Sequence, residues 1–327
     1  MSKRICKKWS EQEEHYVKEN YGKMTCKEIG EHLGRSVGSV RKHLSYLGLN
    51  RPRNKYYFNA TYFNTIDSPE KAHWLGFIAA DGCIIDDSDQ HNSGQHKRVK
   101  IALKASDQNH LVKFRDCIDS NNPIKIEKSV HNEWNIDTDE CVITIYSSSM
   151  VDDLERKGLY PRKTYKLPFP TTRDVPHNLM SHYIRGFIDA DGSFTSRTRG
   201  ENNRRVAEFS VVGATKSFLE SMAAFLNEEL GTSIRLYDKR AGNWIIVASS
   251  RQDVLKILDY AYDCKDITRN SYLDRKYEKY QRVRQELAVC VGDYADNKPG
   301  RNWKPKLDIS MVIRVEGSKE PHAEHSR

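Results

Sequence analysis

The sequence predicts an α+β fold in which a duplicated unit of helices and strands follows a small all-α domain. The duplication is indicated by two apolar segments, residues 74–82 and 184–192, which both end in Asp-Gly steps that lie 110 residues apart. After each step the pattern reads as a strand pair, a helix, a second strand pair and another helix. The all-α domain is indicated by three short amphipathic segments within residues 9–49.

Positive charge is concentrated at the N-terminus of the 327-residue chain. Residues 1–55 contain thirteen Lys and Arg against six Asp and Glu, whereas the other residues contain 40 against 39, and the net charge of the chain is +8. A basic module beside a near-neutral body is typical of proteins that bind phosphates, although a solvated basic surface is an equally simple interpretation.

The composition also excludes several classes of protein. No apolar run reaches the roughly eighteen residues that cross a membrane, and the basic N-terminus lacks the apolar stretch of a secretion signal. Seven separate cysteines without a C-x-x-C pair argue against a disulfide framework or a zinc ribbon. We therefore expect a cytoplasmic, nucleoid-associated protein of a bacterial or phage-infected cell, with no membrane partner.

Residues 1–50 are expected to form a helix-turn-helix module that binds DNA. Ser10 and Glu13 have the spacing of a capping box at the start of the first helix, and Ser36 is the expected N-cap of the third. The third helix offers small polar side chains to base edges and cations to phosphates. Its predicted DNA-binding residues are Ser36, Ser39, Arg41 and Lys42. The segment resembles the Myb-like modules found beside phage and mobile-element nucleases, and a three-helix protein-interaction module is the alternative.

Changes in composition divide the rest of the chain. Residues 51–69 read as a basic linker, and residues 168–178 as a proline-containing joint between the halves of the repeat. The halves themselves cover residues 70–167 and 179–286. Residues 287–327 form a polar, weakly patterned tail that is expected to be partly disordered and to which we assign no role.

The two apolar segments predict a pair of helices that pack against each other. Gly76 and Gly186 each precede an alanine by four residues, and small residues on one helix face at this spacing let two backbones approach closely. Gly82 and Gly192 are expected to end the helices as glycine caps in the left-handed conformation.

Asp81 and Asp191 would then lie at the C-terminal ends of two adjacent helices. A carboxylate at this end of a helix dipole costs about 0.3–1 kcal/mol, and two neighbouring carboxylates also repel each other. A divalent cation that prefers oxygen ligands, Mg²⁺ or alternatively Mn²⁺, would remove both costs and would activate water against a phosphodiester. One Asp-Gly step alone is more simply a turn, but the second copy makes a metal site the better interpretation.

Through Leu75–Gly82 and Gly186–Gly192 the sequence resembles the single-chain LAGLIDADG homing endonucleases. The resemblance covers about residues 70–285 and implies an αββαββα core that is duplicated with pseudo-twofold symmetry. It implies a monomer that binds a long double-stranded DNA site in the major groove, hydrolyses both strands with a divalent metal and leaves short 3′ overhangs. The implied metal ligands are the carboxylates of Asp81 and Asp191 and the backbone carbonyls of Ala80 and Ala190.

The motif departs from the family at one position. The earlier acidic position is Asp189 in the second copy but Ala79 in the first. We interpret this difference as a structural asymmetry, since both copies keep the acid before the final glycine. The family also carries a basic residue near the scissile phosphate, for which Lys163 and Lys276 are the candidates. A surface lysine on an amphipathic helix is the simpler interpretation of Lys276.

Alternation within the predicted strands indicates a basic sheet face in both halves. In residues 98–104, apolar side chains alternate with two lysines and an arginine, and residues 193–199 and 233–239 show similar patterns. Arg and Lys on a β-ribbon can read guanine edges or hold phosphates, although a solvated face is the simpler interpretation of any one residue. The predicted DNA contacts are Arg98, Lys100, Lys104, Arg197, Arg199, Arg235 and Lys239.

Two other functions are compatible with this pattern. A DNA-binding regulator built on the same fold would normally lack the two acids, which this chain retains. An intron RNA maturase, with intron RNA as a second partner, can coexist with DNA cleavage. An intein is not indicated, because no splicing Cys or Ser opens the chain and no His-Asn pair closes it.

Overall fold

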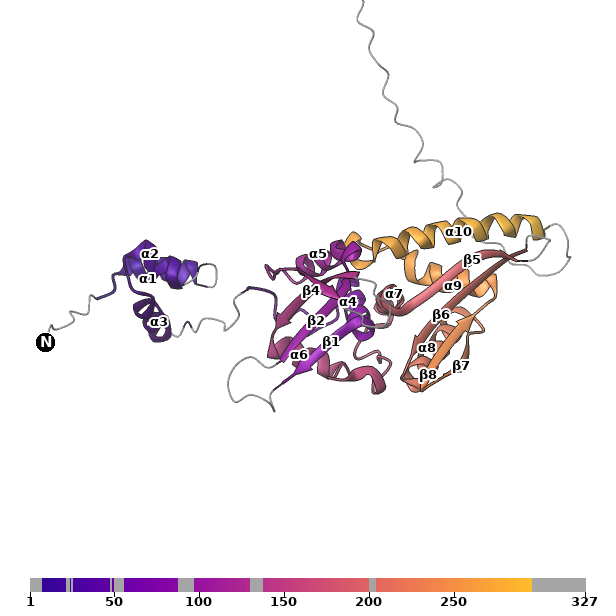
Figure 1. The fold of residues 1–327 in the computed structure, drawn as a ribbon, viewed down its shortest axis with the longest axis horizontal. Coiled ribbons are helices and arrows are strands. Elements are labelled where there is room, and N and C mark those ends of the chain that lie inside the picture. The colour runs from indigo at the N-terminus through magenta and orange to yellow at the C-terminus, as the bar shows by residue number, and fades with distance from the viewer. Residues whose placement is uncertain are drawn as a thin grey trace, which may run out of the picture. The chain divides into compact units, whose positions relative to one another are not determined.

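The computed structural model, drawn in Figure 1, describes residues 8–21, 24, 26–47, 49, 56–87, 97–129, 138–199 and 204–295. It is a mixed structure of helices and two four-stranded antiparallel sheets. No helix in these ranges is long and apolar enough to cross a membrane. Residues 51–55 of the predicted linker and most of the predicted tail lie outside them. The other linker residues are described, and Tyr62, Phe63 and Ile66 among them are buried in the core.

Three helices form at the N-terminal end of the described chain: α1 (Glu11–Asn20), α2 (Cys26–Leu33) and α3 (Val37–Tyr46). The predicted capping box is present, because the Glu13 amide donates to the Ser10 hydroxyl at 3.3 Å and the Ser10 amide donates to the Glu13 carboxylate at 2.9 Å. Gly34, in the turn between α2 and α3, has a left-handed φ of 62°, which glycine adopts without steric cost. The small core of these helices consists of Val17, Cys26, Ile29, Val40 and Leu44.

The same order of elements then occurs twice, as the sequence predicts. The first copy consists of α4 (Pro69–Asp81), β1 (Gly82–Asp86), β2 (Lys97–Lys104), α5 (Gln108–Cys117), β3 (Lys125–Ser129), β4 (Thr138–Tyr146) and α6 (Ser148–Arg156). The second consists of α7 (Met180–Asp191), β5 (Gly192–Arg199), β6 (Arg204–Gly213), α8 (Lys216–Leu230), β7 (Arg235–Arg240), β8 (Asn243–Ala248) and α9 (Arg251–Tyr262). A last helix, α10 (Asp274–Ala295), continues past residue 286, where we expect the second half to end, and its Leu287 is buried.

The two sheets have the same topology. Their strand orders are β1-β2-β4-β3 and β5-β6-β8-β7, so the strand that follows α4 or α7 is an edge strand in each case. In β2 the side chains of Val99, Ile101 and Leu103 are buried and their neighbours are more accessible, which confirms the predicted alternation.

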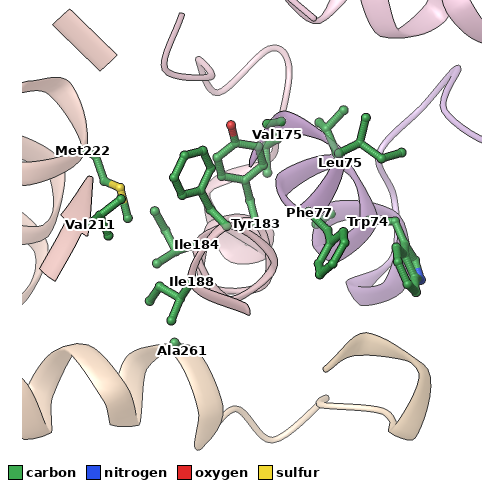
Figure 2. Close-up of a cluster of buried hydrophobic side chains, with 14 of the residues drawn as sticks. Trp74, Leu75, Phe77, Val175, Tyr183, Ile184, Ile188, Val211, Met222 and Ala261 are labelled. Carbon is green, nitrogen blue, oxygen red and sulfur yellow. The ribbon is translucent and has the colours of Figure 1, made fainter. Parts of the chain in front are cut away.

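Helices α4 and α7 pack against each other within one continuous hydrophobic core (Figures 1 and 2). A Cβ atom added to Gly76 would lie 3.2 Å from the backbone nitrogen of Phe187, and one added to Gly186 would lie 2.8 Å from that of Phe77. Each would overlap still more closely with a carbonyl oxygen of the opposite helix. These reciprocal contacts confirm the predicted close approach at the two glycines.

Gly82 and Gly192 end these helices in a conformation that differs from the predicted one. Their φ and ψ angles are −72° and 143°, and −73° and 147°, so both are extended and the expectation of left-handed caps is wrong. A Cβ atom would lie 2.7 Å from the Ile78 carbonyl oxygen at Gly82 and 2.8 Å from the Ile188 carbonyl oxygen at Gly192. Glycine is required because each strand leaves its helix directly over the last helical turn.

Candidate active site

Asp81 and Asp191 are the last residues of α4 and α7, and both side chains reach solvent. The pKa of Asp191 is raised to about 6, first because the surrounding protein limits its hydration and then because of the negative charge of Asp81. Limited hydration also raises the pKa of Asp81, against the opposing charge of Lys163. The structure therefore brings the two carboxylates into each other's electrostatic field.

Lys163 lies beside the end of α4. It is the first residue of the short 3-10 helix η2 (Lys163–Tyr165), and the residue before it, Arg162, has a left-handed φ of 58°. The Lys163 ammonium donates to the carbonyl oxygen of Ala80 at 3.0 Å. Burial lowers the pKa of Lys163, and the charges of the two aspartates oppose that shift. The first predicted lysine is thus placed beside both carboxylates.

Lys276 lies in the first turn of α10 and reaches the end of α7. Its ammonium donates to the carbonyl oxygen of Ile188 at 3.2 Å and to that of Gly192. Only 7 % of Lys276 is exposed, so its interpretation as a surface lysine is wrong. Burial lowers its pKa to about 8, against the opposing charge of Asp189. Both predicted lysines therefore approach the helix ends that carry the acids.

The helix ends offer oxygen ligands of the kind that Mg²⁺ prefers. These are the carboxylates of Asp81 and Asp191 together with backbone carbonyls of the last helical turns, which include Ala80 and Ala190. The ammonium of Lys163 on the Ala80 carbonyl shows that this position attracts positive charge. Among the described residues, no three His, Cys, Asp or Glu side chains cluster as a metal site. The residues present fit a divalent cation that is held by two carboxylates and by carbonyl, water or phosphate oxygens.

Asp189, the extra acid of the second motif, anchors neighbouring segments. It is fully buried and accepts hydrogen bonds from the Tyr262 hydroxyl at 2.6 Å and from the Leu273 backbone amide at 2.8 Å. Burial raises its pKa to about 6. Because Leu273 lies just before Lys276, Asp189 helps to fix the course of the chain into α10, a task that Ala79 cannot perform in the first half.

Two buried histidines lie near Asp189, and from them we expect the stability of the fold to depend on pH. His73 and His110 are 0 % and 1 % exposed, and no described group hydrogen bonds to their ring nitrogens. Burial lowers the pKa of His73 well below its usual value and that of His110 to about 3. The nearby positive charge of Lys113 acts in the same direction on both.

The free energy of unfolding should therefore decrease as the pH falls below about 6.5, because only the unfolded chain takes up protons on these histidines. At pH 5 the loss should reach about 2 kcal/mol per histidine, partly offset by Asp189 and Asp191, whose raised pKa values act in the opposite direction. Urea unfolding between pH 7 and pH 5 measures this loss. In a His110→Phe variant the acid-induced loss at pH 5 should be smaller than in wild type by about 2 kcal/mol, the contribution of one histidine; an unchanged pH profile would contradict the assignment.

The basic face of the first sheet is partly neutralised. Arg98 pairs with Asp87 at 2.6 Å, and the Lys100 ammonium lies 3.5 Å from the Glu127 carboxylate. Lys104, at the end of β2, is exposed. Arg98 and Lys100 must therefore release their carboxylate partners before they can bind a DNA phosphate.

The predicted DNA contacts on the second sheet are not neutralised in this way. Arg197 in β5 and Arg235 and Lys239 in β7 are exposed, and none of the three forms an ion pair with another described residue. Arg199 is the last residue of β5, and its side chain lies outside the described part of the structure. Of the described residues predicted to contact DNA on the two sheets, those of the second sheet are thus the less neutralised.

On α3, the predicted DNA-binding residues divide into two kinds. The Ser36 hydroxyl accepts from the Ser39 backbone amide at 3.2 Å and serves as the N-cap of the helix. Arg41 and Lys42 are exposed and accessible to a partner.

No family model matches the chain, and no curated protein matches it. Among solved structures, the chain is similar to the LAGLIDADG homing endonuclease I-GzeII in complex with its DNA target, with 14% identity, a TM-score of 0.48, and coverage of 70% of this chain and 92% of that one. It is also similar to the meganuclease I-SmaMI bound to uncleavable DNA, with 15% identity, a TM-score of 0.46, and coverage of 70% and 92%. A third is the LAGLIDADG meganuclease I-AabMI bound to uncleaved DNA, with 14% identity, a TM-score of 0.45, and coverage of 69% and 92%. These similarities are distant, and a functional conclusion must rest on the residues of this chain.

Proposed function

We propose that this chain is a site-specific homing endonuclease of the LAGLIDADG type that hydrolyses both strands of a long DNA site. The observation that carries the proposal is the pair of helix-end carboxylates, Asp81 and Asp191, with a lysine ammonium donating to carbonyl oxygens at each helix end. Carboxylates in this position favour a bound divalent cation, Mg²⁺ or Mn²⁺. The short 3′ overhangs and the monomeric state follow from the resemblance of the motif.

Each group of the site has a part in this mechanism. Asp81 and Asp191, with the carbonyl oxygens of Ala80 and Ala190, would hold the cation. When bound, a divalent metal supplies Lewis acidity and activated water for phosphodiester hydrolysis. The two lysines hold positive charge beside the phosphate, where negative charge increases in the transition state. The negative ends of the α4 and α7 dipoles keep these cations in place.

The proposed DNA contacts lie on the two sheets and on α3. The sheets would contact the major groove through Arg98, Lys100, Lys104, Arg197, Arg199, Arg235 and Lys239. Helix α3 would serve as the recognition helix of a Myb-like helix-turn-helix module through Ser36, Ser39, Arg41 and Lys42. The accessible cations of α3 support this assignment, because phosphate contacts supply most of the salt-dependent affinity for DNA.

An Arg41→Ala, Lys42→Ala double variant should bind DNA more weakly and with less dependence on salt. Each lost phosphate contact reduces the slope of log affinity against log salt by about 0.9, so the expected change is about 2. Fluorescence anisotropy at several KCl concentrations measures the slope. Lys18→Ala, which removes an exposed lysine at the end of α1, is the matched control and should leave the slope unchanged. Equal slopes for wild type and double variant would contradict the role of α3.

The proposed activity is tested by challenging the purified protein with a plasmid library of candidate insertion sites, in Mg²⁺ or in EDTA. We expect a small set of related sequences to be linearised in Mg²⁺ and none in EDTA. Sequence-specific binding without cleavage in any divalent cation would instead show a DNA-binding regulator.

A further inference from the structure

The segment that precedes Lys276 is held by side chains of the first half. The Lys113 ammonium, on α5, donates to the Tyr272 carbonyl oxygen at 3.0 Å and to the Asp274 carboxylate at 2.5 Å. The Asn109 side-chain amide donates to the other Asp274 oxygen at 3.0 Å. Helix α10 of the second half therefore begins in contact with α5 of the first.

A second ion pair between the halves lies beside the first. The Nε atom of Arg275 is 2.8 Å from the carboxylate of Asp107, which directly precedes α5. The side chains of Lys113 and Asp107 are only 5 % and 10 % exposed. Their partners Asp274 and Arg275 are 44 % and 54 % exposed, so each pair joins one buried charge to one half-exposed charge. Separating a pair would leave its buried member without a partner, which favours the paired geometry.

The second half holds the same segment from its own side. Asp189 accepts from the Leu273 amide at 2.8 Å, and the buried Arg185 donates to the Ser271 carbonyl oxygen at 2.5 Å. Each of the residues 271–275 therefore has a restraint from one half or the other, and Lys276 follows directly.

The segment around Lys163 has no matching ion pairs among the described residues. Arg162, the counterpart of Arg275, forms no ion pair with another described residue. Helix α8 is the counterpart of α5, and none of its described residues forms an ion pair with residues 162–165. A pocket of about 120 Å³ lies beside Lys163 and is lined in part by Phe218. Both lysines approach the same site, but among the described residues only the segment before Lys276 is held by ion pairs between the halves.

We propose that Lys113 and Asp107 of the first half are positioning residues for Lys276 of the second half. By holding Asp274 and Arg275 they fix the Lys276 ammonium, and the DNA strand whose cleavage Lys276 assists is cut first. This inference rests on the proposed nuclease function. A fixed ammonium needs little rearrangement when the phosphate arrives. The Lys163 ammonium also donates to a carbonyl, that of Ala80, but its segment lacks the ion pairs between the halves, so we expect it to shift more when the phosphate binds.

The test follows each strand of a selected target separately, with a different label on each 5′ end, under single-turnover conditions in Mg²⁺. The variants Lys276→Met and Lys163→Met first show which strand is cut more slowly when each lysine is removed. Wild type should then cut the Lys276 strand faster. Asp274→Asn and Lys113→Met should slow that strand by about tenfold or more, while the other strand changes little, because a displaced catalytic group costs rate at its own site.

Arg284→Met is the matched control. Arg284 ties α10 to α9 within the second half, through Asp259 at 3.1 Å and Asp263 at 2.8 Å, and should lower stability without changing the ratio of the two strand rates. Should Lys113→Met fail to fold, Asp274→Asn still decides the outcome, because the Asp274 side chain is 44 % exposed and the substitution keeps its shape. Equal strand rates in wild type, or equal slowing of both strands in Asp274→Asn, would overturn the proposal. Absence of any cleavage by wild type would instead contradict the nuclease function.

Discussion

Asp81→Asn and Asp191→Asn should each abolish double-strand cleavage and leave DNA binding intact. Asparagine keeps the shape of the side chain but removes the charge that holds a divalent cation. Loss of one charge-stabilising group in an active site typically lowers the rate by about 10²–10³-fold. Because both carboxylates hold the cation, loss of either one should weaken metal binding and prevent the linear product. Gel assays of cleavage and anisotropy assays of binding separate the two effects.

Asp116→Asn is a suitable control for these variants. Asp116 is an exposed acid on α5, and its loss should change neither cleavage nor binding. Binding should even strengthen slightly in Asp81→Asn and Asp191→Asn, since each removes a negative charge near the DNA phosphates. Full cleavage activity in either variant would show that the two helix-end carboxylates are not the metal ligands.

Gly76→Ala and Gly186→Ala should each destabilise the fold by about 3 kcal/mol or prevent folding, which is the upper part of the usual range for overpacked cores. The added methyl group meets backbone atoms of the opposite helix, 2.9 Å from the Tyr183 carbonyl carbon in one case and 2.8 Å from the Phe77 nitrogen in the other. Backbone atoms inside a helix cannot move aside as a flexible side chain can. The helices must therefore separate, and the two carboxylates separate with them.

Urea unfolding measures the loss, and Gly38→Ala provides the control. Gly38 is also a helical glycine, but a Cβ atom there meets no atom within 4 Å, so alanine should leave stability unchanged or raise it by about 1 kcal/mol. Wild-type stability in Gly76→Ala would contradict the close helix contact on which the acidic pair depends.

Local sequence patterns predict the elements and the acidic pair because short-range physics determines them. The two-residue period of a strand explains why Val99, Ile101 and Leu103 are buried. The need for space between two helix backbones explains Gly76 and Gly186. These features can be deduced from residues that lie close together in the chain.

Contacts between distant residues cannot be deduced in this way. Lys113 and Asp274 are 161 residues apart, and nothing in either segment indicates that they meet. The burial of Lys276 depends on where α10 docks, and the extended conformation of Gly82 depends on the direction in which β1 leaves its helix. Only the Asp-Arg-Lys run 274–276 gives a signal, because three charges in succession suggest that some of them have partners.

Direct measurement of metal binding tests the central claim, which is that Asp81 and Asp191 jointly hold a divalent cation. Mn²⁺ has an electron paramagnetic resonance signal that reports bound and free ion, so it can be titrated into wild type and into the Asp81→Asn, Asp191→Asn double variant, each bound to the selected DNA. We predict tightly bound Mn²⁺ on wild type, displaced by excess Mg²⁺, and loss of that binding in the double variant. Equal Mn²⁺ binding by the two proteins would contradict the account.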